Sequence, residues 1–290
     1  MGIIKTSRVL VAFTRLDLAA EQAALWRLGQ SSFAVRIAGQ SVLLDPFLSP
    51  VDGRLEPPPF PPEAASGIDV IACTHEHLDH FDAAALPTIM EASPAARIVV
   101  PAPIVDLALG LGIPAERVIA ARAGIAMDFG SFTIHPVRAK HGVHVDDAYS
   151  FGEKLSGGEA RFLGYVLESA GVRIFHAGDS LVYEGMAERL KELRVDVALL
   201  PINGRDYYRE SQDIVGNMDP REALELAARA GVDIVVPMHY EMFTENLGYA
   251  AHLVEVATRF FPGISIALLT KERPFIYSSL GFPKSELEFR

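Results

Sequence analysis

The chain has 290 residues, 50% of them hydrophobic, a formal net charge of −11 and a sequence pI near 5.3. This length and composition predict a globular protein with a large core, and the acidic balance excludes a basic surface for nucleic acid. The single cysteine excludes an internal disulfide framework, and no apolar run reaches the length of a signal core or a membrane span. We therefore expect a cytoplasmic protein that binds neither nucleic acid nor membrane.

Apolar runs of strand length recur along the chain, each followed by a turn or a helical segment. We predict strands at 25–27, 33–37, 41–44, 68–74, 97–100, 132–138, 162–168, 172–176, 196–200, 233–237, 264–269 and 274–278. Helices are predicted at 184–193, 219–230 and 246–261. The helix at 219–230 has Asp219 as N-cap, Glu222 three positions later and Gly231 at its end.

No shift in composition marks a linker, so we predict a single domain over residues 1–290. Strands that come in blocks, with helices between the later ones, favour two packed sheets covered by helices. Two connections, 142–161 and 202–218, exceed the usual loop length of a compact domain. Each is interpreted as a lid or substrate-binding loop, with a solvated surface excursion as the alternative.

Three histidines and one aspartate lie within six consecutive positions directly after the apolar run 68–74, in the segment His75-Glu76-His77-Leu78-Asp79-His80. Imidazole nitrogens and carboxylate oxygens are ligands of zinc, manganese and iron. Alternating side chains on an extended or tightly turned segment direct His75 and His77 at one ion, and Asp79 and His80 at another. The motif therefore predicts two metal ions, whereas the alternative is a polar surface turn.

A two-metal site needs more ligands than this motif supplies, and other apolar strands also end at a histidine or an aspartate. Asp45 follows 42–44, His141 follows 133–139, Asp179 follows 173–178 and His239 follows 234–238. Strand ends at one edge of a sheet converge in space. We therefore expect these side chains to lie beside the motif.

Some of these assignments have alternatives within the sequence. Asp45 also suits a turn, and as a functional residue it is expected to orient a histidine rather than to bind metal directly. His135 and His144 compete with His141 for the same role. His176 is expected either behind a ligand or near the substrate.

The pattern resembles the metallo-β-lactamase superfamily, whose members carry a His-x-His-x-Asp-His motif and later single His, Asp and His ligands. Within it, the chain is most similar to the L-ascorbate-6-phosphate lactonase family. The similarity is carried by Trp26-Arg27-Leu28-Gly29-Gln30, Asp45-Pro46-Phe47-Leu48-Ser49, the prolines 57–59, Cys73-Thr74-His75, residues 200–206 and Gly216-Asn217-Met218. The resemblance implies an α/β fold, a four-layer αββα sandwich.

The resemblance also implies how the ligands divide between two ions. The first ion would be held by His75, His77 and His141, the second by Asp79, His80 and His239, with Asp179 bridging them. The implied cofactors are two divalent ions, Mn²⁺ or Zn²⁺, and the implied assembly is a homo-oligomer.

The expected reaction is hydrolysis by a water that two metal ions activate. The resemblance makes the substrate a small anion, a phosphorylated sugar lactone such as L-ascorbate 6-phosphate. The predicted catalytic residues are Asp79, which would orient the nucleophile, Asp45 and His176. The predicted substrate-binding residues are Arg205, which would hold the anion by charge-assisted hydrogen bonds, Asn203 and Tyr207.

Three other functions compete with lactone opening. A phosphodiesterase would use the same metal site on a cyclic nucleotide or another phosphodiester. A flavo-diiron oxidoreductase is disfavoured because such enzymes typically have a carboxylate where this chain has His77. A non-catalytic metal protein is disfavoured because structural zinc is usually closed by four ligands, and this chain offers seven.

Overall fold

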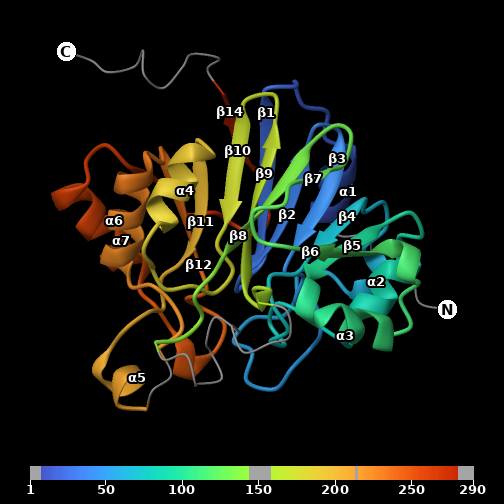
Figure 1. Ribbon diagram of the computed structural model, residues 1–290, viewed down its shortest axis with the longest axis horizontal. Coiled ribbons are helices and arrows are strands. Elements are labelled where there is room, and N and C mark those ends of the chain that lie inside the picture. Colours follow the sequence, from blue (N-terminus) through green and yellow to red (C-terminus); the bar gives the residue numbers. More distant parts are fainter. Residues whose placement is uncertain (1–7, 144–157, 213–214, 280–290) are drawn as a thin grey trace.

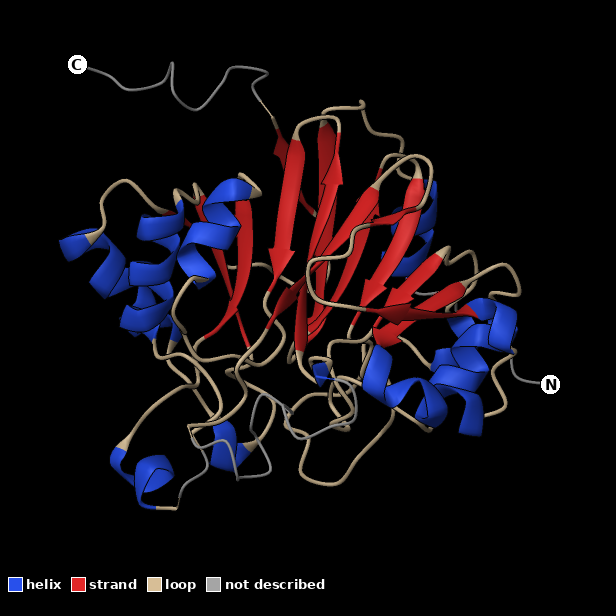
Figure 2. Cartoon of the chain, viewed as in Figure 1, coloured by secondary structure: helices blue, strands red, loops and turns tan. Residues whose placement is uncertain are grey.

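The structure is a computed structural model that describes residues 8–143, 158–212 and 215–279. Two seven-stranded sheets form the centre of the molecule, and helices flank them on both sides (Figure 1, Figure 2). The predicted α/β class and the αββα sandwich are confirmed.

The first sheet comes mainly from the N-terminal part of the chain, in the order β14-β1-β2-β3-β4-β5-β6. Its strands are β1 (Gln22–Gly29), β2 (Ser32–Ile37), β3 (Gln40–Leu44), β4 (Val70–Ala72), β5 (Arg97–Pro101), β6 (Val118–Ala121) and β14 (Phe275–Ser278). Strands β3 to β6 are parallel, whereas β14, β1, β2 and β3 alternate in direction.

The second sheet has the order β13-β12-β11-β10-β9-β8-β7. Its strands are β7 (Met127–Asp128), β8 (Thr133–Arg138), β9 (Leu163–Ser169), β10 (Val172–His176), β11 (Val197–Pro201), β12 (Ile234–Met238) and β13 (Ser265–Ile266). Strands β10 to β13 are parallel, and β7 to β10 alternate. Each sheet therefore has a parallel half, whose strands end at the same edge.

Helices form the two outer layers. The first sheet is covered by α1 (Arg8–Arg15), α2 (Leu86–Ala92) and α3 (Val105–Gly110), and the second by α4 (Met186–Glu192), α6 (Pro220–Ala230) and α7 (Ala250–Phe260). A short helix, α5 (Tyr207–Ser211), lies apart from both layers, on the side where the strands of the parallel halves end (Figure 1). Among the described residues, no helix is both long and apolar enough to cross a membrane.

The two faces of the first sheet bury different side chains. Leu25 points between the sheets and shares an apolar cluster with Tyr165 of the second sheet. The next residue, Trp26, points the other way and packs edge-on against Phe13 of α1, with 5.6 Å between ring centroids. Burying each such side chain contributes about 1.5–3 kcal/mol. This alternation along a strand is the reason that both faces of the sheet are covered.

The predicted strands and the three predicted helices are confirmed, with shifted ends. The capping box of α6 is present, because Asp219 accepts from the backbone N–H of Glu222 and Glu222 accepts from that of Asp219. Helix α7 begins at Ala250 rather than at 246, since Thr244–Asn246 forms a separate 3₁₀ turn. Helices α1, α2, α3 and α5 and strands β6 and β7 were not predicted, because short elements give little periodicity.

Candidate metal centre

The predicted ligands lie at one edge of the sandwich, where strands from both sheets end. The six-residue motif follows β4, His141 follows β8, Asp179 follows β10 and His239 follows β12. Figure 1 shows the loops of both sheets meeting below the strands. Convergence of strand ends, rather than proximity in sequence, therefore assembles the site.

Three histidines form the first group of donor atoms. Nδ1 of His77 lies 3.0 Å from Nε2 of His75 and 3.2 Å from Nε2 of His141. His75 and His141 are buried, and His77 is partly exposed at the pocket. These three nitrogens lie within 4.8 Å of one another, a spacing that suits one metal ion.

A second group consists of Asp79, His80 and His239, whose donor atoms also lie within 4.8 Å of one another. Nε2 of His239 is 3.2 Å from Oδ2 of Asp79, and Nε2 of His80 is 3.6 Å from the same oxygen. His80 and His239 are buried, whereas Asp79 keeps part of its surface at the pocket.

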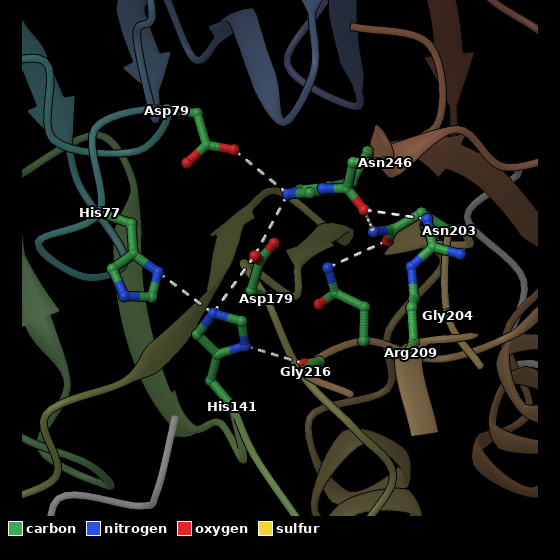
Figure 3. A pocket seen from close by; sticks show the side chains of 11 residues that line it. His77, Asp79, His141, Asp179, Asn203, Gly204, Arg209, Gly216 and Asn246 are labelled. Atoms are coloured by element: carbon green, nitrogen blue, oxygen red, sulfur yellow. Dashed lines mark hydrogen bonds and ion pairs between the residues drawn. The ribbon is translucent and has the colours of Figure 1, made fainter. Parts of the chain in front are cut away.

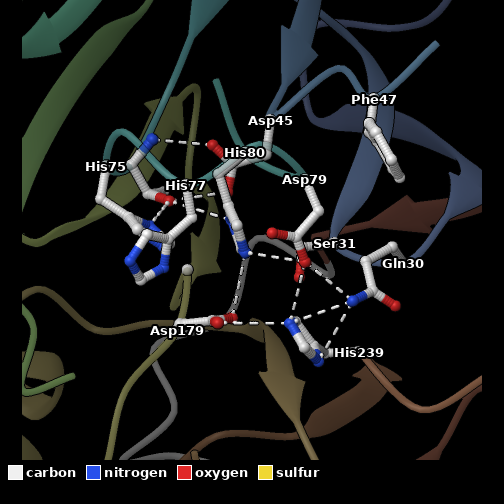
Figure 4. Close-up of polar contacts among 12 residues, drawn as sticks. Gln30, Ser31, Asp45, Phe47, His75, His77, Asp79, His80, Asp179 and His239 are labelled. Carbon is white, nitrogen blue, oxygen red and sulfur yellow. Dashed lines mark hydrogen bonds and ion pairs between the residues drawn. The ribbon is translucent and has the colours of Figure 1, made fainter. Parts of the chain in front are cut away.

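The carboxylate of Asp179 lies between the two groups (Figure 3, Figure 4). Its Oδ1 is 3.2 Å from Nε2 of His80, and its Oδ2 is 3.2 Å from Nε2 of His239 and 3.5 Å from Nε2 of His141. Asp179 thus contacts a histidine of the first group and two of the second.

Hydrogen bonds behind the ligands orient the imidazoles. Nδ1 of His80 donates to Oδ2 of Asp45 over 2.6 Å, and Nδ1 of His141 donates to the backbone carbonyl of Gly216 over 2.9 Å. Thr74 donates its hydroxyl to Asp45 over 2.7 Å and lies 3.0 Å from Nδ1 of His75. Because Nδ1 is engaged in this way, the imidazoles of His75, His80 and His141 each direct Nε2 toward the other donor atoms.

Asp45 and His176 are both fully buried, and neither lines the pocket. Nε2 of His176 donates to the carbonyl of Ser31 over 2.7 Å, and its Nδ1 accepts from the N–H of Gly178 over 3.2 Å. The structure therefore places both residues behind the donor groups. Their predicted catalytic role is corrected to one of positioning, since a side chain without access to the pocket does not touch substrate.

Burial and charge set the protonation of the two groups in opposite directions. Burial lowers the pKa of His75 well below its usual range and that of His141 to about 4. Burial also opposes a charge on His239, but Asp179 outweighs it and raises the pKa of His239 to about 9. Burial opposes ionisation of Asp179 too, yet His239 and His80 hold its pKa well below the usual range. The first group therefore offers neutral imidazoles, and the second pairs carboxylates with imidazolium ions.

Buried atoms between the groups fit a cation. Nε2 of His80 and Oδ1 of Asp179 are buried and face each other at 3.2 Å, and neither atom makes a hydrogen bond within the described chain. Imidazole nitrogens and carboxylate oxygens are donors that zinc, manganese and iron accept. The residues present thus fit divalent metal ions.

A pocket of about 140 Å³ opens over the donor atoms. Its opposite wall is polar and includes Asn203, Asn217, Asn246 and Arg209 (Figure 3). Asn217 donates to Asn203 over 3.0 Å, and Asn203 donates to Asn246. Arg209 is only 8% exposed, and its guanidinium contacts Asp206 and Asn246.

The structure brings Asn203 to the pocket but not Arg205 or Tyr207. The guanidinium of Arg205 pairs with Glu222 at 3.1 Å and with Glu210 at 3.5 Å, and Tyr207 is 88% exposed. The assignment of these two residues to substrate binding is therefore corrected. Helix α5 begins at Tyr207 and turns Arg209 toward the pocket in place of Arg205.

The competition among three histidines is partly resolved. His141 lies in the first group, whereas His135 faces Glu168 across the strand pair β8–β9, with 2.8 Å between Nε2 and Oε2. His144 and most of the predicted loop 142–161 lie outside the described residues.

The sequence reading missed several residues that complete the site: Gln30, Thr74, Arg209, Gly216, Asn217 and Asn246. One local signal was available for Gln30, which sits between Gly29 and two serines in a tight turn. Its φ of +53°, like the +43° of Asp45 and the +57° of His239, is rare outside glycine and concentrates backbone strain at this site.

Comparison with known proteins identifies the family of this chain. The model of the beta-lactamase superfamily domain matches residues 40–240. A UPF0173 metal-dependent hydrolase of Myxococcus xanthus is 31% identical over 220 residues, 74% of this chain and 69% of that protein. A probable L-ascorbate-6-phosphate lactonase of Salmonella paratyphi B is 26% identical over 196 residues, 66% of this chain and 54% of that protein.

A solved structure shows the same fold at lower identity. Igni18, a metallo hydrolase from the archaeon Ignicoccus hospitalis, superposes with a TM-score of 0.67 at 21% identity, covering 89% of this chain and 99% of that one. The predicted resemblance to the metallo-β-lactamase superfamily is confirmed by the family match and by the relative with 31% identity. The chain therefore belongs to the beta-lactamase superfamily, and within it to the metal-dependent hydrolases.

Proposed function

We propose that this metal-dependent hydrolase opens a phosphorylated sugar lactone, such as L-ascorbate 6-phosphate, with two divalent ions, Mn²⁺ or Zn²⁺. The observation that carries the proposal is the position of Asp179 between two donor groups, under a pocket whose far wall is polar and contains a buried arginine. Similarity to a probable lactonase over 66% of the chain supports the choice of substrate.

In this proposal, His75, His77 and His141 hold the first ion, and Asp79, His80 and His239 hold the second. Asp179 bridges them, in agreement with its contacts to both groups. When bound, such ions lower the pKa of a water toward neutrality and polarise the oxygen of a carbonyl.

Asp79 is proposed to orient the attacking water. It lines the pocket, and its carboxylate is partly accessible. Although burial opposes its ionisation, His80 and His239 hold the pKa of Asp79 below its usual range. Asp79 therefore stays a carboxylate at neutral pH and accepts a hydrogen bond from water, rather than acting as a general base.

The far wall of the pocket is proposed to bind the substrate. Its three asparagines offer amide donors and acceptors for sugar hydroxyls, and Arg209 offers a positive charge for the phosphate. Asp206 and the turn at 245–247 hold the guanidinium in place, which reduces the conformational entropy lost on binding. Arg209 thus takes the role that the sequence had suggested for Arg205.

The test is hydrolysis by metal-reconstituted protein, with manganese and zinc compared in parallel. The substrates are a phosphorylated sugar lactone, a bis-aryl phosphodiester and a cyclic nucleotide. Lactone opening well above the other two supports the proposal. Preference for either diester would keep the metal ligands but assign the protein to the phosphodiesterases, the alternative function.

The remaining proposals rest on the sequence. A homo-oligomer, a small anionic substrate and a cytoplasmic location stay predictions, as does a single domain over residues 1–290. Light scattering on the purified protein measures the oligomeric state.

A further inference from the structure

Gln30 lies in the turn between β1 and β2 and belongs to neither donor group, yet its side chain reaches the second one. The residue is 1% exposed. Its backbone is tied to the segment after β12, because Gln30 N–H donates to Glu241 over 3.0 Å and the carbonyl of Gln30 accepts from His239 N–H over 3.1 Å. The turn is thus held against the strand end that carries a candidate ligand.

The amide head of Gln30 completes a triangle with two proposed ligands of the second ion. Its terminal nitrogen lies 2.8 Å from Oδ2 of Asp79 and 3.1 Å from Nε2 of His239, and these two atoms are 3.2 Å apart (Figure 4). In an octahedral shell with bonds of about 2.1 Å, neighbouring donors stand about 3 Å apart. Three side-chain heads therefore converge at the spacing of one coordination sphere.

The two ends of an amide have nearly the same shape, but only the oxygen has a lone pair for a cation. At present the nitrogen faces Asp79 and His239, while Oε1 is buried and makes no hydrogen bond within the described chain. A half turn of the amide exchanges the two ends without moving the backbone. The same turn brings an oxygen to the point where the other two donors meet.

We propose that Gln30 contributes its side-chain oxygen as a further ligand of the second metal ion, together with Asp79, His80 and His239. The inference rests on the second ion of the proposed function. The competing role is that of a hydrogen-bond donor, in which the nitrogen of Gln30 orients Asp79 and never contacts metal.

Two substitutions separate these roles. Gln30→Met keeps the length of the side chain and removes both oxygen and nitrogen. Gln30→Glu keeps the oxygen and removes the nitrogen, so it suits a metal ligand but places a carboxylate against Asp79 if no cation lies between them. Gln40→Glu is the matched control, because it adds the same charge to a glutamine at the far end of β3.

The experiment is a calorimetric titration of the metal-free proteins with Mn²⁺, with metal content measured after dialysis and melting temperature measured with and without Mn²⁺. If Gln30 is a ligand, Gln30→Met lowers the affinity for the second ion about 10–100-fold. Gln30→Glu then binds the second ion at least as tightly as wild type does. Its melting temperature is lower than that of wild type only in the absence of metal. Gln40→Glu leaves both ions unchanged.

Two results would overturn the inference while leaving the two-ion proposal intact. If Gln30→Glu lowers the affinity for the second ion as much as Gln30→Met does, the amide nitrogen is the group that acts. Two ions bound normally by both variants would exclude any role in metal binding. A wild-type protein that binds a single ion overturns the two-ion proposal as well.

Discussion

The imidazole of His80 donates a hydrogen bond of 2.6 Å to Asp45, and both side chains are completely buried. The bond fixes the tautomer of His80 and turns its Nε2 toward Asp179 at 3.2 Å. A carboxylate outside both donor groups therefore sets the orientation of a donor atom within the second group.

Replacing that carboxylate by an amide tests its role. We expect Asp45→Asn to lower the affinity for the second metal ion about 10–100-fold, because an uncharged oxygen polarises the imidazole of His80 less. Asparagine tolerates the φ of +43° at this position, so the fold should persist. Calorimetric titration measures the effect, with Asp69→Asn as the control because the Asp69 side chain accepts from the backbone N–H of Ser41, at the opposite end of β3 from Asp45. Equal affinity in wild type and Asp45→Asn would contradict this role.

The position between the groups makes Asp179 the most sensitive ligand. Asp179→Asn should lower the number of bound ions from two to one and reduce hydrolysis more than about 100-fold. Metal analysis after dialysis and a hydrolysis assay measure the two effects. Asp106→Asn on the exposed side of α3 serves as the control. Full turnover in Asp179→Asn would rule out the dinuclear assignment.

A glycine holds the first group in place. A Cβ at Gly216 would lie 2.4 Å from Cε1 and 2.5 Å from Nδ1 of His141, so Gly216→Ala should displace that ring. We expect about a 10-fold loss of affinity for the first ion. Gly263→Ala is the control, since a Cβ there meets no atom within 4 Å. Unchanged affinity in Gly216→Ala would show that the contact does not position His141.

Arg209 should discriminate charged from neutral substrates. Arg209→Gln is expected to lower kcat/KM for a phosphorylated lactone about 10–100-fold, the equivalent of a lost charged hydrogen bond of about 1.5–3 kcal/mol. A neutral lactone should change little. Arg205→Gln is the matched control, because the partly exposed pair of Arg205 with Glu222 contributes about 0–1 kcal/mol. Equal losses on both substrates would indicate a structural role for Arg209.

Metal binding should release protons. Burial opposes a charge on His239, but Asp179 outweighs it, so the pKa in the metal-free protein is about 9. A cation must displace that proton, and metal affinity should therefore rise from pH 7 toward pH 9. Titrations in buffers of different ionisation enthalpy count the protons, and a count of zero at pH 7 would contradict the prediction.

The same shift makes the stability of the metal-free protein depend on pH. Because the folded pKa of His239 lies above its ordinary value of 6.5, its stabilising charge is fully present below that pH. The stabilisation is lost as the pH rises through about 9. Melting temperatures of the metal-free protein between pH 6 and pH 10 measure this loss, and His239→Gln should flatten the profile.

Much of the fold was predictable because its signals are local. The apolar runs of β1, β2, β3 and β8 to β12 each lie within a few residues, and the capping box of α6 spans four positions. Helix α5 and strand β7 were missed because five and two residues are too few to show a period. Three histidines within six positions made the motif at 75–80 visible in the same local way.

The two-sheet architecture and the donor types of the metal centre were predictable from the sequence alone, since strand patterns and a compact motif need no knowledge of distant contacts. The packed structure was needed to show that His141 rather than His135 faces the motif, because β8 turns His135 toward Glu168 and the end of that strand brings His141 to the first donor group. It also placed Arg209 rather than Arg205 at the pocket, since the start of α5 sets the direction of each side chain. These choices depend on how strand ends converge, and that convergence is a property of the packed sheets rather than of any segment.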